Sequence, residues 1–154
     1  LSLVGSEMCI RDRNNSYFCY CIVNKQSNSA IINRAMKKIL LVDDKATIGR
    51  VLKIYLGTEY DLEYFENPLK ALEWLNEGNI PDLIISDIHM PHMRGNEFLY
   101  YLKGNELFRH IPVVMLSSEE STVERIQLLE AGAADYILKP FNPLELRARI
   151  KKYI

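Results

Sequence analysis

The sequence predicts an α/β protein with a doubly wound, five-stranded parallel sheet that carries helices on both faces. Between residues 36 and 154, short apolar runs alternate five times with segments of helical period, which is typical of repeated strand–helix units. The first, third and fourth runs contain almost no polar residues, as in parallel strands that are covered on both faces. Right-handed crossovers between such strands leave few alternative topologies.

The expected strands are short and rich in Ile, Leu and Val, and they span residues 38–42, 61–65, 83–86, 112–116 and 135–138. A helix is expected after each strand, because apolar residues recur there at intervals of three and four. The recurring positions are Ile48, Val51, Leu52, Tyr55 and Leu56, then Leu69, Leu72, Trp74 and Leu75, then Phe98, Leu99 and Leu102, then Val123, Ile126 and Leu129, and finally Leu146, Ile150 and Tyr153. The pairs Asn67-Pro68 and Asn142-Pro143 predict helix starts, since Asn caps a helix and Pro fits its first turn. Gly132 is expected to end the fourth helix.

Residues 1–35 differ in composition from the rest of the chain. They show neither helical nor alternating periodicity, and Asn, Ser, Ile and Tyr are frequent among them. Residues 8–13, with the sequence MCIRDR, resemble the translation of a transposon-end adapter used in sequencing libraries, and Met36 reads like a natural start. We therefore expect a non-native or disordered leader at residues 1–35 and a single domain at residues 36–154.

Charge and cysteine content argue against several classes of protein. The formal net charge of −1 provides no electrostatic basis for binding nucleic acid or an anionic membrane. All three cysteines precede residue 36, so the predicted domain has no disulfide framework, as expected in the reducing cytoplasm. Cys19 and Cys21 lack the spacing that is usual in zinc sites.

Polar side chains follow four of the predicted strands at the point where each strand ends. The carboxyl ends of parallel strands share one edge of the sheet, and ligands bind along that edge. The residues concerned are Asp43 and Asp44, then Asp87, then Ser117 and Ser118, and then Lys139. Three carboxylates at one edge repel one another unless a cation lies among them. The sequence therefore predicts a cation site.

From residue 36 to residue 154, the chain resembles the response-regulator receiver domains of two-component signalling. The resemblance rests on ordered motifs: the Asp43-Asp44 pair, the Asp87-x-x-Met90-Pro91 segment with Gly95, the hydroxyl of Ser117, and the segment AGAADYILKPF that contains Tyr136 and Lys139. Each motif is weak alone, but their order and separations are specific. The resemblance implies a flavodoxin-like fold, with the strands of the domain in the order 2-1-3-4-5.

The resemblance also implies a role for each site residue. Asp87 is expected to accept a phosphoryl group, and Mg²⁺ suits this chemistry because it is a hard cation that prefers carboxylate and water ligands. Asp44 and Asp87 are expected to bind Mg²⁺ directly, Asp43 mostly through water, and His89 through its backbone carbonyl. Lys139 is expected to contact a phosphoryl oxygen.

A switch is implied as well. The Ser117 hydroxyl is expected to move inward and bond a second phosphoryl oxygen. Tyr136 is then expected to turn inward and repack the face formed by the fourth helix, the fifth strand and the fifth helix. The bond between Lys139 and Pro140 is a candidate cis peptide, because the cis form costs little only before proline.

The resemblance further implies a cytoplasmic signalling protein and not a classical enzyme. Its phosphodonor is expected to be a sensor histidine kinase or a phosphotransfer protein, and its output partner is unknown. Phosphorylation-dependent homodimerisation is a further expectation. No direct contact of this domain with nucleic acid or membrane is expected.

Each of these residues also has a plainer interpretation. Asp43 and Asp44 are acceptable N-caps for the first helix, and Ser117 and Ser118 for the fourth. Tyr136, judged without the resemblance, is as well explained by static packing as by a switch. His89 and His92 form a His-x-x-His pattern that suggests a transition metal, but a solvated loop pair explains them better. The resemblance implies that His89 and Glu119, each two residues after a site residue, affect the lifetime of the phosphoryl group, whose length the sequence leaves open.

Three alternative functions stay open. The first is the receiver module of a DNA-binding transcription regulator whose output domain is missing from this chain. The second is a Mg²⁺-dependent phosphatase with an aspartyl nucleophile, although such enzymes of the haloacid-dehalogenase type need an acid where His89 stands. The third is a degenerate receiver that acts by binding alone, which the complete set of site residues argues against.

Overall fold

A computed structural model describes residues 7–11, 17–21 and 36–154 of the chain, and it divides the chain into two units, Leu1–Ala35 and Met36–Ile154. In the first unit, strands β1 (Glu7–Arg11) and β2 (Tyr17–Cys21) pair antiparallel. No strands were predicted in this segment from the sequence. The foreign origin of this segment stays a prediction.

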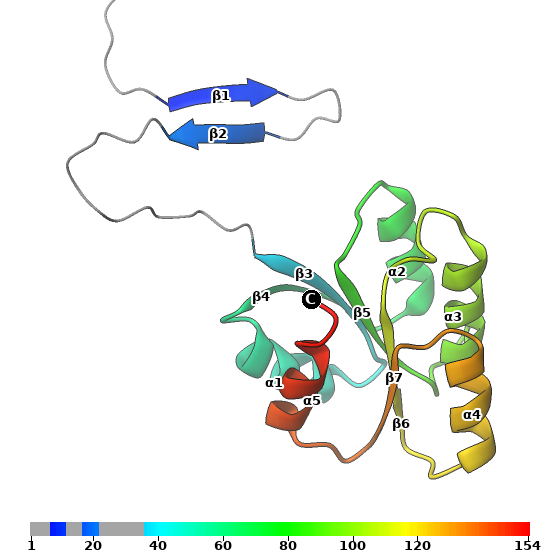
Figure 1. Ribbon diagram of the computed structural model, residues 1–154. Coiled ribbons are helices and arrows are strands. Elements are labelled where there is room, and N and C mark those ends of the chain that lie inside the picture. Colours follow the sequence, from blue (N-terminus) through cyan, green and yellow to red (C-terminus); the bar gives the residue numbers. More distant parts are fainter. Residues whose placement is uncertain (1–6, 12–16, 22–35) are drawn as a thin grey trace, which may run out of the picture. The chain divides into compact units, whose positions relative to one another are not determined.

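The second unit is built on five parallel strands (Figure 1). These are β3 (Lys37–Val42), β4 (Tyr60–Phe65), β5 (Leu83–Asp87), β6 (Val113–Ser117) and β7 (Asp135–Leu138). Their order in the sheet is β4-β3-β5-β6-β7, which is 2-1-3-4-5 when the strands of the domain are counted from β3. The predicted fold is therefore confirmed, with each strand within one residue of its expected position.

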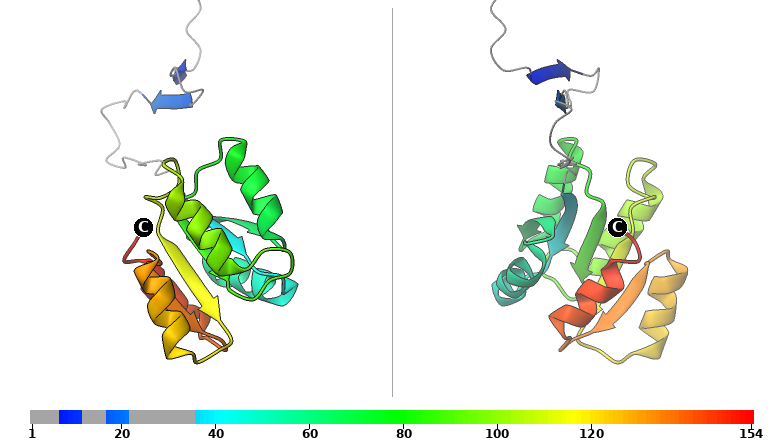
Figure 2. Two further views of the ribbon diagram at one scale, coloured as in Figure 1. Left: turned by 90° about the vertical axis from the view of Figure 1, so that its right-hand side faces the viewer. Right: turned by 60° about the vertical axis from the view of Figure 1, so that its left-hand side comes forward.

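Two helical layers cover the sheet, as Figures 1 and 2 show. Helices α1 (Ala46–Leu56) and α5 (Pro143–Ile150) lie on one face, and α2 (Pro68–Asn76), α3 (Gly95–Gly104) and α4 (Thr122–Glu130) lie on the other. Because successive side chains of a strand point to opposite faces, each apolar strand contributes to two cores. Leu40 and Ile84 pack with α2 and α3, whereas Leu41 and Ile85 pack with α1 and α5.

The helix starts at the two Asn-Pro pairs are confirmed. The side chain of Asn67 accepts a hydrogen bond from the backbone N–H of Leu69 at 2.8 Å, and Asn142 accepts one from Leu144 at 2.9 Å. Each Asn thus satisfies an amide group that has no partner within its helix.

Helical periodicity overestimated how much of α1 and α4 is buried. On α1, Leu52 and Leu56 are buried, but Val51 and Tyr55 are exposed. On α4, the apolar residues that predicted the helix are all exposed: Val123, Ile126 and Leu129. Helix α5 ends at Ile150, so the prediction that Tyr153 belongs to it is wrong. No helix in the described part of the chain is both long and apolar enough to cross a membrane.

Candidate functional site

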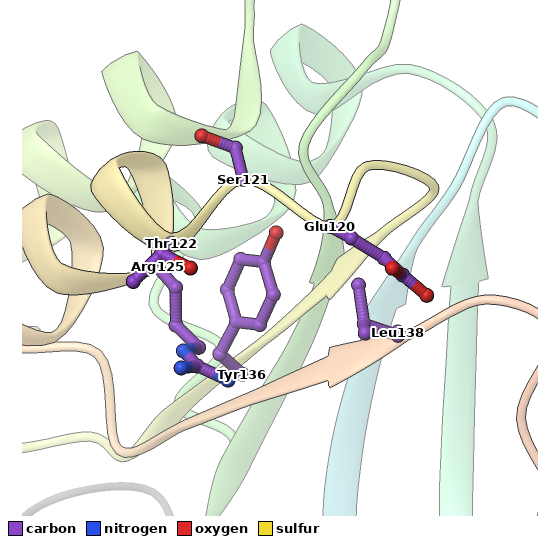
Figure 3. A pocket seen from close by; sticks show the side chains of 6 residues that line it. All are labelled: Glu120, Ser121, Thr122, Arg125, Tyr136 and Leu138. Carbon is purple, nitrogen blue, oxygen red and sulfur yellow. The ribbon is translucent and has the colours of Figure 1, made fainter.

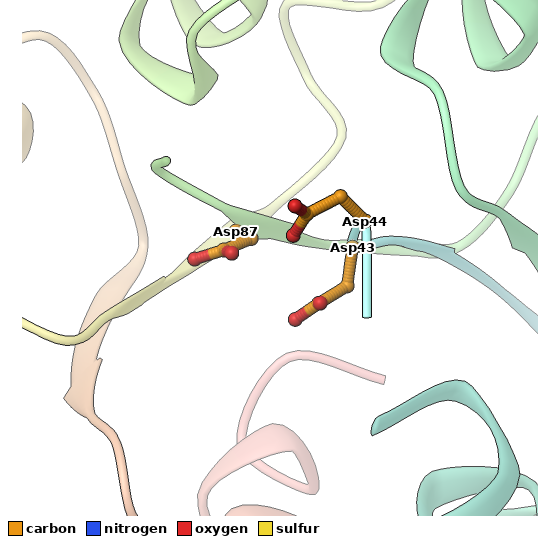
Figure 4. Close-up of side chains that lie close together, drawn as sticks. All are labelled: Asp43, Asp44 and Asp87. Atoms are coloured by element: carbon orange, nitrogen blue, oxygen red, sulfur yellow. The ribbon is translucent and has the colours of Figure 1, made fainter. Parts of the chain in front are cut away.

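Three carboxylates gather at the carboxyl edge of the sheet. Asp43 and Asp44 follow the last residue of β3, and Asp87 is the last residue of β5. These strands are neighbours, with Val42 opposite Ser86, so both ends reach the same point. Each acid offers one oxygen, and these oxygens all lie within 4.8 Å of one another (Figure 4). Asp43 and Asp87 are buried, whereas Asp44 is more exposed.

Lys139 joins this cluster from the end of β7. Its Nζ lies 2.6 Å from Asp43 Oδ2 and 3.0 Å from Asp87 Oδ2, and its side chain is only 9% exposed. The peptide bond between Lys139 and Pro140 is cis, as predicted. One buried ammonium group is therefore shared by two buried carboxylates, and its single positive charge leaves the three acids with an excess of negative charge.

The cluster fits a divalent metal ion. Burial raises the pKa of Asp43, and the nearby charge of Asp87 adds to this, although hydrogen bonds from Lys139 and from the backbone of Lys45 oppose both effects. A divalent cation would relieve this cost, because it favours the ionised form of each acid. An all-carboxylate donor set suits a hard cation such as Mg²⁺, Ca²⁺ or Mn²⁺.

Gly95 lets helix α3 approach the end of β5. Its backbone N–H donates to the carbonyl of Ile88 at 2.8 Å, and a Cβ atom at this position would collide with the backbone of Asp87 and Ile88. The Asp87 carboxylate also accepts a hydrogen bond from the N–H of Ile88 at 2.9 Å. Close backbone approach thus explains why glycine stands here.

Ser117 and Tyr136 meet at the backbone of Glu119. The Ser117 hydroxyl accepts a hydrogen bond from the N–H of Glu119 at 3.0 Å and donates one to its carbonyl at 3.3 Å. The Tyr136 hydroxyl donates to the same carbonyl at 2.8 Å, and burial raises its pKa. Tyr136 is already buried in this structure. The predicted pair of switch residues is therefore linked through one peptide group.

A cavity of about 340 Å³ lies beside Tyr136 (Figure 3). Its walls come from the start of α4 and from β7: Glu120, Ser121, Thr122, Arg125, Tyr136 and Leu138. One oxygen of the Glu124 carboxylate is buried without a hydrogen-bond partner. The space around the Tyr136 ring is thus loosely filled on the α4 side.

The two histidines do not form a joint metal site with the acids. His89 Nε2 lies 3.4 Å from Glu119 Oε1, so this contact links the loops that follow β5 and β6. His92 is exposed and has a positive φ of 72°. Within the described residues, the cluster with metal-ligand spacing contains only aspartates.

The capping alternatives are wrong. The N-cap of α1 is Lys45, and the N-cap of α4 is Ser121, whose side chain accepts a hydrogen bond from the N–H of Glu124. Asp43 accepts from the N–H of Lys45 at 2.9 Å, one residue before the helix begins. Neither the acid pair nor Ser117 and Ser118 serves as a helix cap.

One contact at the site was missed in the sequence. The hydroxyl of Tyr64 on β4 donates to the backbone carbonyl of Asp43 at 2.8 Å. Tyr64 lies in a predicted strand, but no role was assigned to it from the sequence. The contact forms because β4 lies beside β3 in the sheet. It could be predicted only once the pairing of these two strands was known.

Comparisons with known proteins agree with this geometry. The family model described as "Response regulator receiver domain" matches residues 39–151. Histidine kinase P4 of Formosa agariphila is 40% identical over 124 residues, which are 80% of this chain and 9% of that protein. The DNA-binding response regulator MtrA of Mycobacterium tuberculosis is 37% identical over 116 residues, which are 75% of this chain and 49% of that protein. The chain thus spans half or less of the length of these curated relatives.

A solved structure shares the fold. The chemotaxis protein CheY4 of Vibrio cholerae is 30% identical, with a TM-score of 0.72, over 78% of this chain and 100% of that chain. The family model itself covers nearly all of the unit Met36–Ile154. The chain therefore belongs to the response-regulator receiver domains of two-component signalling.

Proposed function

We propose that Asp87 accepts a phosphoryl group from a histidine kinase or a phosphotransfer protein, in a reaction that requires Mg²⁺. The observation that carries this proposal is the position of Asp87, which is buried at the carboxyl end of β5 beside two further acids and 3.0 Å from Lys139. A carboxylate with a cation beside it can attack phosphorus without building up uncompensated charge.

Each residue of the site has its own role in this phosphoryl transfer. Asp44 and Asp87 would bind the metal directly, Asp43 would act mostly through water, and His89 would add its backbone carbonyl. When bound, Mg²⁺ supplies positive charge that offsets the incoming phosphoryl oxygens. Lys139, whose Nζ lies 3.0 Å from Asp87 Oδ2, would contact one oxygen of the phosphoryl group that Asp87 accepts.

The conformational response begins at Ser117. To bond a phosphoryl oxygen, its hydroxyl must give up its two contacts with the backbone of Glu119. Glu119 also holds the hydroxyl of Tyr136, so a shift of this loop changes the packing of Tyr136 against α4. The phosphoryl group stabilises the shifted state only by the extra contacts that it makes there.

We also propose a cellular location for the domain. Because its phosphodonor is a kinase, we expect it to act in the cytoplasm, as a switch that does not turn over an external substrate. Its output partner is a second protein or a second copy of the chain, and the domain does not bind DNA itself. The phosphatase alternative finds no support in the relatives, which are named as kinases and response regulators.

Acetyl phosphate with Mg²⁺, followed by intact-mass measurement, tests the proposal. We expect one added phosphoryl group, absent in Asp87→Asn and abolished by EDTA. Asp61→Asn is a matched control, because Asp61 is exposed and does not belong to the acidic cluster. Its Oδ2 lies 3.8 Å from Lys38 Nζ. Labelling that persists in Asp87→Asn contradicts the assignment of the acceptor. Continuous release of phosphate from external phosphate esters contradicts the proposal that the domain is not an enzyme.

A further inference from the structure

Tyr64 fixes the backbone of the acid pair. Both backbone polar groups of Asp43 are held by β4: its N–H donates to the carbonyl of Phe65 at 3.2 Å, and its carbonyl accepts from the Tyr64 hydroxyl at 2.8 Å. That carbonyl belongs to the peptide group that joins Asp43 to Asp44. Fixing this planar group therefore restricts the directions in which the Asp44 side chain can leave the backbone.

Gly49 provides the space that the Tyr64 ring needs. A Cβ atom at Gly49 would lie 2.8 Å from Cε1 and Cζ of Tyr64 and 2.9 Å from Cε2. The glycine is buried in the interior of α1, where glycine costs about 1 kcal/mol relative to alanine. The ring thus lies directly against the helix backbone, and the helix accepts a less favourable residue at the point of contact.

The Tyr64 hydroxyl stays protonated over the whole physiological range. Burial, together with the negative charges of Glu66, Asp43 and Asp44, raises the pKa of Tyr64 to about 12. The hydroxyl therefore donates its proton to the Asp43 carbonyl, in the hydrogen bond that the structure shows.

We propose that Tyr64 is a positioning residue for the metal site: its hydroxyl fixes the peptide group between Asp43 and Asp44, and Gly49 makes room for the ring that carries this hydroxyl. The inference rests on the proposed function, because it concerns the same acids. Groups that orient metal ligands typically change metal affinity by 10–100-fold when they are lost. The contact here is to the backbone of a ligand, so we expect an effect near the lower end.

Two variants of the full chain remove this contact in different ways. Tyr64→Phe keeps the ring and loses the hydroxyl. Gly49→Ala keeps the hydroxyl but forces the ring away from α1, and it improves helix propensity. Tyr153→Phe is the matched control, because the Tyr153 hydroxyl donates to the backbone carbonyl of Ala134, also at 2.8 Å. That hydrogen bond joins the segment after α5 to the residue before β7, and it involves none of Asp43, Asp44 and Asp87.

The measurement is Mn²⁺ binding to the unphosphorylated protein by electron paramagnetic resonance, since Mn²⁺ accepts the same carboxylate ligands as Mg²⁺. We expect about tenfold weaker binding in Tyr64→Phe, a similar loss in Gly49→Ala, and unchanged binding in Tyr153→Phe. The double variant should bind no more weakly than the single ones, because all three lack one and the same contact. Circular dichroism shows that each variant is folded at the temperature of the titration.

Unchanged Mn²⁺ affinity in both Tyr64→Phe and Gly49→Ala overturns the inference. An equal loss in Tyr153→Phe also overturns it, because the effect is then one of general stability. These outcomes are independent of the proposed function: a wild-type chain that takes up no phosphoryl group refutes that function, whereas the Mn²⁺ titrations alone decide the role of Tyr64.

Discussion

Lys139 is the residue on which the charge balance of the acidic cluster depends. It contacts Asp43 at 2.6 Å and Asp87 at 3.0 Å, and both carboxylates are buried. Removing one partner of a buried ion pair leaves an uncompensated charge, which costs far more than losing an exposed pair. Lys139 thus supplies positive charge in direct contact with both buried carboxylates.

Replacing Lys139 with Met should therefore destabilise the domain by about 3–5 kcal/mol in EDTA. Mg²⁺ should recover part of this loss, because a ligand that binds only the folded state stabilises it. Urea denaturation with and without Mg²⁺ measures both effects. Lys151→Met is the control: Lys151 is 51% exposed and pairs with Glu59 at 3.2 Å, so its loss should cost at most about 1 kcal/mol. A free energy of unfolding in Lys139→Met that matches this control contradicts the prediction.

Helices α3 and α4 lie on the same face of the sheet but are anchored very differently. Helix α3 buries Gly95, Phe98, Leu99 and Leu102, whereas α4 buries only Leu128. The cavity beside Tyr136 and the unpaired oxygen of Glu124 lie at the start of α4. An element with few buried contacts opens at low free energy, so α4 is suited to move when the loop at Glu119 moves.

Amide hydrogen exchange should therefore be at least about tenfold faster in α4 than in α3, because each fully buried large apolar side chain contributes about 1.5–3 kcal/mol. Leu128→Ala should abolish the remaining protection of α4 while β5 and β6 stay protected. Leu129→Ala is the matched control, because the neighbouring Leu129 is 43% exposed. Equal protection of α3 and α4 in the wild type would show that α4 is anchored by more than Leu128.

At the scale of the whole molecule, the domain is self-contained from Met36 onward. Both cores consist of residues from Ile39 to the C-terminal region, and the unit Leu1–Ala35 is separate from the unit Met36–Ile154. Both faces of the sheet are closed by helices that belong to the second unit. Among the residues that the structure describes, we therefore expect 36–154 to account for the stability of the domain.

Deletion of residues 1–35 should change the free energy of unfolding by no more than about 0.5 kcal/mol, the range typical of changes outside the core. Phosphorylation by acetyl phosphate should also be unaffected. Urea denaturation of the full-length and shortened chains, measured in parallel, checks this expectation. A loss above about 1 kcal/mol would mean that the first unit contributes to the stability of the domain.

The sequence by itself determined the class of the fold and the identity of the acid–lysine cluster. The five strands could be placed within one residue, because period and apolar content are properties of neighbouring residues in the chain. Asp43 and Lys139 could be brought together from 96 residues apart, because the carboxyl ends of parallel strands share an edge of the sheet. Asn67 and Asn142 could be recognised as helix starts because each forms a hydrogen bond with a residue only two positions further along the chain.

Only the tertiary structure decided which of these residues touch and how. The contact of Tyr64 with the Asp43 carbonyl depends on the pairing of β4 with β3 and on the gap at Gly49. The exposure of Val51 and Tyr55 depends on how α1 is rotated against the sheet. The inward position of Tyr136 depends on the carbonyl of Glu119, 17 residues away. Each of these three features depends on how segments that are distant in the chain pack together. The periodicity of a local segment does not contain that information.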